Sequence, residues 1–253
     1  MTRVTVENVW KVYGDQTVLE NINLEIEPGS FIALVGPSGC GKSTFLRMML
    51  GDEAPSKGRI LVDGVPLESE PSPDRGVVFQ KYSVFPHLTA LQNVMLGLEF
   101  AGSPFTARLF GRARRTARAA ALDMLQCVGL EQAVRKYPAE LSGGMQQRLA
   151  IAQALVKKPK ILLLDEPFGA LDPGIRAEVH EILLRLWREE GMTVFMVTHD
   201  LSEAFKLGTR VIAFDRRRTR PEEIKVFGAS VTFDLKVDGK TIPVPLPALA
   251  AAQ

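Results

Sequence analysis

The sequence lacks the features that would tie the chain to an oxidising compartment, a membrane span or a polyanion. Its 253 residues include only two cysteines, Cys40 and Cys127, so no disulfide framework is available and a reducing environment is expected. No stretch approaches the roughly 18 consecutive apolar residues of a spanning helix, and the first ten residues lack the apolar run of a signal peptide. The 31 basic and 29 acidic side chains leave a net charge of +2, which does not suggest nucleic acid as a partner. A role at a membrane would therefore require a partner protein.

What is present is an ordinary globular composition with alternating strand and helix patterns. Hydrophobic residues make up 46% and charged residues 24%, and the length suits one large domain with a subdomain. Residues 4–26 alternate like antiparallel strands, and 58–67 contains the favoured hairpin turn Asp63-Gly64. Apolar runs typical of buried strands follow at 31–35, 75–80, 160–167, 193–200 and 210–215, with helical patterns between them. We therefore predict an α/β fold with a mostly parallel core sheet, an antiparallel β layer and an α-helical subdomain.

The stretch GPSGCGKST (36–44) is a phosphate-binding loop in the setting that this motif needs. It fits G-x-x-x-x-G-K-[ST], follows the apolar run 31–35 and precedes the helical pattern 45–50. Glycines allow successive backbone N–H groups to converge on an anion, and the helix N-terminus adds partial positive charge. Lys42 can reach the β and γ phosphates, and the Ser43 hydroxyl can ligate Mg²⁺. The loop indicates a P-loop NTPase but leaves its type open.

Polar side chains at the ends of later strands narrow the chemistry to nucleotide hydrolysis. Asp165 ends the apolar run ILLLD, where its carboxylate can hold Mg²⁺ directly or through water. Glu166 follows it and can orient and deprotonate a water for in-line attack on a γ-phosphate. Gln80 ends another strand and can bind Mg²⁺ or water, and His199, which also ends a strand, can hydrogen-bond a γ-phosphate.

The segment LSGGMQQR (141–148) predicts a second phosphate-binding end. Ser142 and the two glycines after it open a helix, so a hydroxyl and free N–H groups point at one spot. One nucleotide cannot use two such ends of one compact domain if they lie far apart. A head-to-tail dimer, in which each γ-phosphate is clamped by the partner's Ser142 end, solves this problem.

These motifs, in this order, resemble the ATP-binding-cassette ATPases over roughly residues 1–215. The match comprises GPSGCGKST, Gln80, LSGGMQQR, ILLLDEP, GALD (169–172) and His199, and LSGGMQQR is far more specific than the phosphate loop. The resemblance implies that Tyr13 stacks on adenine, that Glu166 is the general base, and that His199 fixes the attacking water and the γ-phosphate. It implies that Gln80 links the γ-phosphate site to a membrane subunit. The implied nucleotide-binding residues are Tyr13, Gly36, Pro37, Ser38, Gly39, Cys40, Gly41, Lys42, Ser43, Thr44, Gln80, Ser142, Gly143, Gly144 and Asp172, with Ser43, Gln80 and Asp165 on the metal.

A single cassette without a membrane span looks like a stand-alone subunit of a bacterial importer. We expect an ATP-binding core at 1–88 and 159–215, a helical subdomain at 89–158 and an extension at 216–253 with a hairpin around 231–246. Residues 72–98 are similar to the nitrate/sulfonate/taurine group, while the arginine-rich 105–118 and the C-terminal stretch resemble ATPases encoded with urea carboxylase-type enzymes. The implied cofactors are ATP and Mg²⁺. The implied partners are a second copy of the chain, integral-membrane permease subunits and, indirectly, a periplasmic solute-binding protein, with the chain on the cytoplasmic face of the inner membrane.

Several alternatives stay open at the level of sequence. An exporter or lipid-transport cassette carries the same motifs, and so does a soluble, non-transport ATPase of this type. Arg114 and Arg115, with Arg112 and Arg118, fit a solvated helix face or a contact with lipid headgroups or the permease. Tyr82, Phe85 and Leu88 fit either subdomain core or a groove for a permease helix. Cys40 lies inside the phosphate loop, so a bulky thiol adduct is expected to block nucleotide entry; the alternative is that Cys40 is a small residue that merely fits there.

Overall fold

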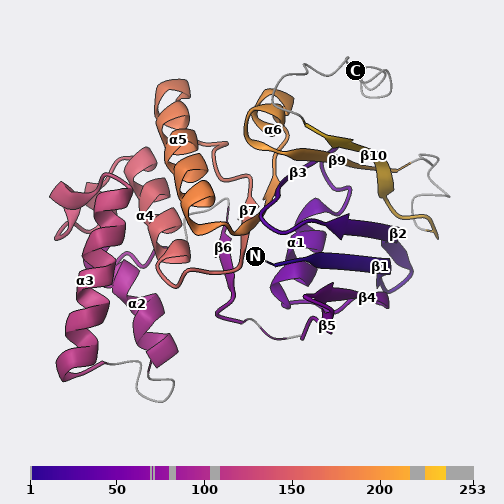
Figure 1. Ribbon diagram of the computed structural model, residues 1–253. Coiled ribbons are helices and arrows are strands. Elements are labelled where there is room, and N and C mark those ends of the chain that lie inside the picture. Colours follow the sequence, from indigo (N-terminus) through magenta and orange to yellow (C-terminus); the bar gives the residue numbers. More distant parts are fainter. Residues whose placement is uncertain are drawn as a thin grey trace.

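A computed structural model describes residues 2–68, 70, 72–79, 84–102, 109–216 and 226–237, which form two sheets and a set of helices (Figure 1). The larger sheet has the strand order β10-β9-β3-β8-β7-β6, and its neighbours are parallel except for β10 on β9. Its strands are β3 (Phe31–Val35), β6 (Arg75–Val78), β7 (Ile161–Asp165), β8 (Thr193–Val197), β9 (Arg210–Asp215) and β10 (Ser230–Lys236).

The smaller sheet is antiparallel throughout and has the order β2-β1-β4-β5. Its strands are β1 (Val4–Tyr13), β2 (Gln16–Ile26), β4 (Lys57–Val62) and β5 (Val65–Pro66). Asp63 and Gly64 join the last two with positive φ angles of 52° and 81°, which is the backbone that a two-residue hairpin turn of this kind requires. The antiparallel layer and the mostly parallel core sheet that the sequence predicts are thus both present.

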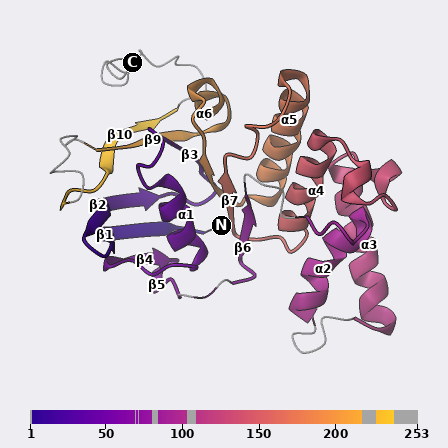
Figure 2. The ribbon, with the colours of Figure 1, turned by 180° about the vertical axis from the view of Figure 1, so that it is seen from behind.

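The helices divide between the two faces of the core sheet and a separate group. They are α1 (Lys42–Leu50), α2 (Ala90–Gly102), α3 (Gly111–Cys127), α4 (Gly143–Leu155), α5 (Pro173–Glu190) and α6 (Leu201–Leu207), with short 3₁₀ turns at Glu131–Ala133 and Pro138–Glu140. The helices α2, α3 and α4 pack on one another, on the side of the core sheet away from the antiparallel layer (Figures 1 and 2). No helix among the described residues is both long and apolar enough to cross a bilayer.

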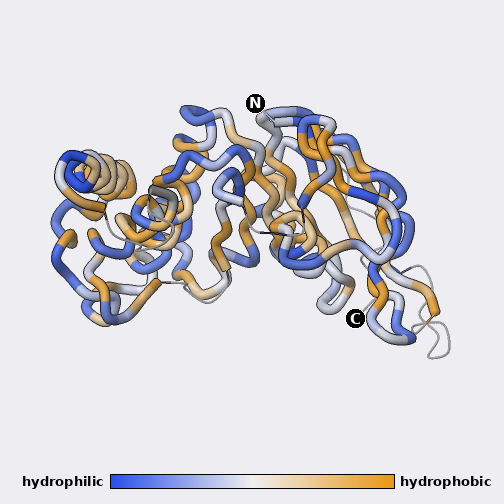
Figure 3. The backbone as a smooth tube through the Cα atoms, turned by 90° about the horizontal axis from the view of Figure 1, so that it is seen from below, coloured by the Kyte–Doolittle hydropathy of each residue, from blue (hydrophilic) through white to orange (hydrophobic). Residues whose placement is uncertain are grey.

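Both faces of the core sheet are buried, because side chains of each strand alternate between two apolar clusters. In β3, Phe31 and Ala33 join a cluster with helices α4, α5 and α6, whereas Ile32 and Leu34 face α1 and the antiparallel sheet. This explains why the strands read as continuous apolar runs rather than as polar–apolar alternation. Polar stretches gather at the outer turns of the trace (Figure 3).

The C-terminal strand has a partner that its local pattern does not reveal. Ser230–Lys236 pairs antiparallel with β9, from Ser230 opposite Asp215 to Lys236 opposite Arg210. The remainder of the hairpin predicted around 231–246 lies outside the described residues from 238 onward. This strand therefore extends the edge of the core sheet.

Candidate functional site

Three neighbouring strands end at the same level, and the predicted site residues follow those ends. In the order β3-β8-β7, Leu34 and Asp165 both pair with Val197. The phosphate loop follows β3, Glu166 follows β7 and His199 follows β8. Since ligands of open α/β sheets bind beyond the carboxyl ends of the strands, this edge is where a nucleotide belongs.

The phosphate loop is held in its shape by close backbone packing and by its own lysine. Gly36 has φ 141°, and a Cβ there would lie 2.0 Å from the Phe214 carbonyl oxygen, so only glycine fits. Lys42 is 7% exposed, and its Nζ donates hydrogen bonds to the carbonyl oxygens of Gly36 (2.7 Å) and Pro37 (2.9 Å). Its ammonium group therefore lies within the curl of the loop, where phosphate oxygens would bind.

Ser43 and Asp165 meet at the start of α1 and provide oxygen ligands. The Ser43 hydroxyl donates to Asp165 Oδ1 at 3.1 Å. Burial raises the pKa of the Asp165 carboxyl, the Ser43 hydrogen bond acts in the opposite direction, and the neighbouring Glu166 charge raises the pKa further. A carboxylate in this condition gains from a bound cation, and carboxylate and hydroxyl oxygens are ligands that Mg²⁺ accepts together with phosphate oxygens.

Glu166 and His199 face each other beside this pair. His199 Nδ1 lies 3.5 Å from Glu166 Oε2. Glu166 has φ 46°, an uncommon backbone for a residue with a side chain, and its N–H donates to the Val197 carbonyl oxygen at 3.0 Å. The main chain of β8 thus holds the turn that presents the carboxylate, and such strained turns cluster at functional sites.

Tyr13 lies beside the phosphate loop, supported by two residues that the sequence reasoning missed. Its hydroxyl is hydrogen-bonded to a Glu53 carboxylate oxygen, and Lys11 Nζ lies 3.0 Å from that oxygen and 4.8 Å from the Tyr13 ring centroid. Burial and the Glu53 carboxylate raise the pKa of Tyr13 to about 12, against which a Thr44 hydrogen bond acts weakly. The ring is 43% exposed, so it remains accessible next to Thr44. The only signal for Lys11 was its position two residues before Tyr13 on the same face of a strand.

The helix that the sequence predicts after Ser142 begins there in the structure. Ser142 caps α4, its Oγ accepting the Met145 N–H at 3.3 Å, and both Ser142 and Gly143 are exposed. Gly144 is buried because α4 packs there against Ile175 in the first turn of α5. Asp172 occupies the N-cap of α5 without a capping hydrogen bond from its side chain.

The structure changes the interpretation of Cys40, and it does not describe Gln80 or Tyr82. The Cys40 side chain is 2% exposed and points away from solvent, and burial raises the pKa of its thiol despite Lys42 Nζ at 3.7 Å. Only its main chain is available to a phosphate, and an adduct at this sulfur would first require the loop to open. Gln80 and Tyr82 lie outside the described residues.

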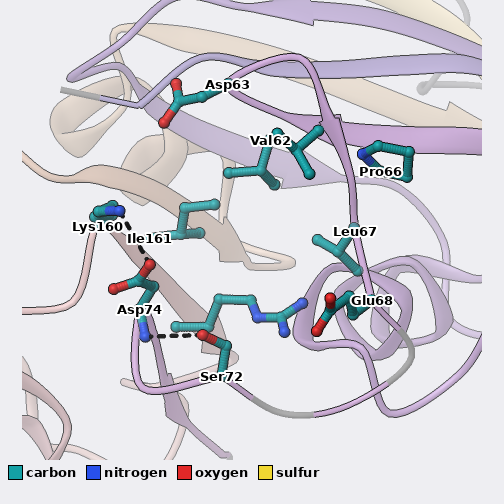
Figure 4. Close-up of a pocket in the computed structure, with 11 residues that line it drawn as sticks. Val62, Asp63, Pro66, Leu67, Glu68, Ser72, Asp74, Lys160 and Ile161 are labelled. Carbon is teal, nitrogen blue, oxygen red and sulfur yellow. Dashed lines mark hydrogen bonds and ion pairs between the residues drawn. The ribbon is translucent and has the colours of Figure 1, made fainter.

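The cavity in Figure 4, of about 330 Å³, is remote from these residues. It lies between the edge of the antiparallel layer and the starts of β6 and β7, where Lys160 and Asp74 form an ion pair at 3.0 Å. Because Ile161 is the first residue of β7, the cavity is at the amino ends of the parallel strands. It is therefore at the opposite edge of the sheet from the predicted site.

Comparisons with known proteins agree with this geometry. A family model described as "ABC transporter" matches residues 19–169. The bicarbonate transport ATP-binding protein CmpD of Synechocystis sp. is 46% identical over 213 residues, which are 83% of this chain and 73% of that protein. The aliphatic sulfonates import ATP-binding protein SsuB 1 of Burkholderia cenocepacia is 45% identical over 215 residues, 85% of this chain and 62% of that protein.

Among solved structures, the dimeric MJ0796, described as a bacterial ABC transporter cassette, matches with a TM-score of 0.75 and 34% identity. The match covers 93% of this chain and 99% of MJ0796. The post-hydrolysis dimer of the same cassette, bound to ADP and Pi, has a TM-score of 0.74. The chain therefore belongs to the ABC transporter family, as an ATP-hydrolysing nucleotide-binding subunit of the importer type.

Proposed function

We propose that two copies of this chain close head to tail around two MgATP and that hydrolysis drives uptake of a small solute through a membrane permease. The observation that carries the proposal is the adjacency of the Glu166 carboxylate and the His199 ring, 3.5 Å apart, beyond the strand ends that also present Ser43 and Asp165. Hydrolysis of a γ-phosphate needs a base, a hydrogen-bonding group and metal ligands close together. Here a carboxylate, an imidazole and a metal-binding pair lie together at the carboxyl ends of the core-sheet strands.

Each residue has a distinct task in this proposal. Glu166 orients and deprotonates the attacking water, and His199 holds that water and the γ-phosphate. Lys42 contacts the β and γ phosphates, and the free N–H groups of the loop bind their remaining oxygens. Tyr13 stacks on the adenine, its orientation fixed by the hydrogen bond to Glu53.

Magnesium is proposed to bind Ser43 and Asp165, with Gln80 as a further ligand. Both described ligands are oxygen donors, and a cation would compensate the carboxylate whose pKa burial raises. When bound, Mg²⁺ neutralises charge on the β and γ oxygens. Ser43 and Asp165 orient one another through their hydrogen bond, and so hold the ligand set together.

The dimer follows from the exposure of the second anion-binding end. Ser142 and Gly143 lie at the start of α4, and Asp172 lies at the start of α5. All three residues are exposed. In the proposal these groups reach the nucleotide on the opposite subunit. The dimeric assembly named for the MJ0796 cassette supports this arrangement.

The permease is proposed to dock in an apolar groove of about 320 Å³ between β6 and helices α2 and α4. Phe79, Phe85 and Phe100 line it with 40%, 40% and 53% of their surface exposed. Clustered exposed aromatic side chains mark a site for another protein. The groove lies beside β6, which ends near the γ-phosphate site, so docking there would connect the permease to that site at the cytoplasmic face of the inner membrane.

The proposed solute is of the nitrate/sulfonate/taurine type or a guanidinium- or urea-like nitrogen compound. The relatives' names give bicarbonate, aliphatic sulfonates and, for FbpC of Brucella abortus at 44% identity, Fe(3+) ions. Such diversity at similar identity indicates that the solute is selected by another component, here a periplasmic binding protein. Calorimetry on the binding protein encoded with this chain, titrated with guanidine, urea, taurine, nitrate and bicarbonate, would identify the solute.

The catalytic proposal is tested by Glu166→Gln. This change removes the base while keeping the shape, so we expect a loss of at least about 100-fold in turnover and a stable ATP-bound dimer on gel filtration. Glu131→Gln, at an exposed glutamate of a 3₁₀ turn, is the matched control and should retain both turnover and the normal elution profile. If Glu166→Gln elutes only as a monomer with ATP, the two-site dimer is wrong.

A further inference from the structure

Three buried polar side chains lie in a row directly behind His199. The Thr198 hydroxyl donates to Glu203 Oε2 at 2.6 Å, and His180 Nε2 lies 3.0 Å from Glu203 Oε1. Thr198, Glu203 and His180 are 2%, 6% and 4% exposed. Thr198 directly follows β8, Glu203 belongs to α6 and His180 belongs to α5, so the row joins three parts of the fold.

One end of this row holds the backbone on both sides of His199. The Thr198 Oγ1 that donates to Glu203 also accepts the Asp200 N–H at 3.1 Å. Asp200 Oδ1 in turn accepts the N–H groups of Ser202 (2.9 Å) and Glu203 (3.2 Å), which caps α6. Both chain neighbours of His199 are therefore tied to Glu203.

The other end reaches the segment that carries Glu166. The His180 ring packs edge-on against the Phe168 ring, with centroids 4.5 Å apart. Phe168 is 1% exposed and lies two residues after Glu166. The row thus spans from the turn that carries the imidazole to the turn that carries the proposed catalytic carboxylate.

A carboxylate in this position is costly unless both oxygens are bonded, and both Glu203 oxygens are. Apolar residues of similar volume often replace such buried polar groups without loss of stability. Apolar packing is not directional, whereas hydrogen bonds are. The directions of these hydrogen bonds determine where the backbone of residues 198–200 lies.

We propose that Thr198 and Glu203, backed by His180, are positioning residues that hold the His199 turn at a fixed place relative to Glu166. This rests on the proposed role of His199 in hydrolysis. None of the three is proposed to touch ATP or water; they act by keeping the imidazole within reach of the γ-phosphate. Displacements of about 1 Å at a catalytic group can cost about 100-fold in rate.

The strand β8 offers a matched control at its opposite end. Thr193 is 0% exposed, and its hydroxyl also donates one hydrogen bond, to the Thr2 carbonyl oxygen (2.9 Å), and accepts one, from the Gly29 N–H (3.1 Å). Thr198→Val and Thr193→Val therefore remove the same number of hydrogen bonds at the two ends of one strand, although the Thr198 hydroxyl donates to a carboxylate and the Thr193 hydroxyl to a backbone carbonyl. Thr198→Ser keeps the hydroxyl and serves as the conservative variant.

We expect Thr198→Val to lower kcat for ATP about tenfold or more, with KM within about twofold, because the phosphate loop, Lys42 and Tyr13, which supply most of the proposed ATP contacts, are unchanged. Thr193→Val should leave kcat within about twofold while also lowering Tm, and Thr198→Ser should recover most of the activity of the wild type. Equal losses of kcat in the two valine variants, or no recovery with serine, would overturn the positioning role.

A double-mutant cycle with His199→Ala separates this inference from the proposed function. If Thr198 acts through His199, Thr198→Val should add less than about twofold to the loss already caused by His199→Ala. A full additive loss would show that Thr198 acts otherwise and refutes the inference alone. Unchanged kcat in His199→Ala would instead refute the proposed role of His199, and with it the basis for positioning.

Discussion

The packing of the α4 N-terminus against α5 predicts that Gly144→Ala destabilises the protein. A Cβ at Gly144 would lie 2.2 Å from Ile175 Cγ2, well inside van der Waals contact. Ile175 is β-branched and sits in a helix, so its methyl group has little freedom to rotate away and the helices must shift. Overpacking of this kind costs about 1–3 kcal/mol. Alanine in a helix regains about 0.5–1 kcal/mol over glycine, which leaves a net loss of up to about 2.5 kcal/mol.

For a chain of this size each kcal/mol corresponds to about 2–4 °C in Tm, so Gly144→Ala should melt a few degrees below the wild type by circular dichroism. Gly174→Ala is the control, since Gly174 lies in the first turn of α5 with no atom within 4 Å of the added Cβ. It should melt at or above the wild-type temperature. If Gly144→Ala melts as high as Gly174→Ala, the contact with Ile175 does not limit the approach of the helices. Ile175→Ala combined with Gly144→Ala should be less destabilised than the sum of the two single variants.

Three further outcomes follow from the charges and thiols of the site. Burial raises the pKa of the Cys40 thiol, so mass spectrometry after brief maleimide treatment at pH 7 should find Cys127, which is exposed, modified and Cys40 intact. Glu53→Gln should lower the pKa of Tyr13 from about 12 in a titration followed by phenolate absorbance. The absorbance step that belongs to Tyr13 is the one that disappears in Tyr13→Phe. Burial raises the pKa of Asp165, so its ionised carboxylate destabilises the folded protein at neutral pH. Asp165→Asn should therefore raise Tm at pH 7 without nucleotide, and the gain in Tm should shrink as the pH falls and the wild-type carboxyl becomes protonated. The same variant should abolish turnover.

The sequence was sufficient to locate the segments of the candidate site that are contiguous motifs. We predicted the positions of residues 36–44, of the end of β7 and of the N-cap of α4 together with the strand or helix that adjoins each. Recognising each of them requires only a strand or helix boundary and a local run of residue types. The hairpin turn Asp63-Gly64 was predicted for the same reason. In each case the information lies within about ten residues along the chain.

The parts that were not predicted depend on partners distant in sequence. Glu53 meets Tyr13 across 40 positions, and Glu203 meets His180 across 23, with no periodicity that links them. The burial of Cys40 depends on its packing within the apolar cluster that includes α1 and the antiparallel sheet, and its place in the motif does not reveal this. The strand from Ser230 pairs with β9, whereas its alternating pattern suggested only a partner further along the chain.

The assembly of the site follows from strand order more than from any one motif. In sequence the phosphate loop, Glu166 and His199 are separated by more than a hundred residues and then by about thirty, yet β8 lies between β3 and β7 in the sheet. Because Leu34 and Asp165 pair with the same residue, Val197, the chains leave the three strands at one level. A one-residue slip of β8 would move His199 by about 3.3 Å along the strand and reverse the faces of its side chains. The hydrogen bonds of Thr198, at the carboxyl end of β8, and of Thr193, at its amino end, oppose such a slip. Both hydroxyls therefore help to fix the position of the strand, whereas only the Thr198 hydroxyl also directs the imidazole.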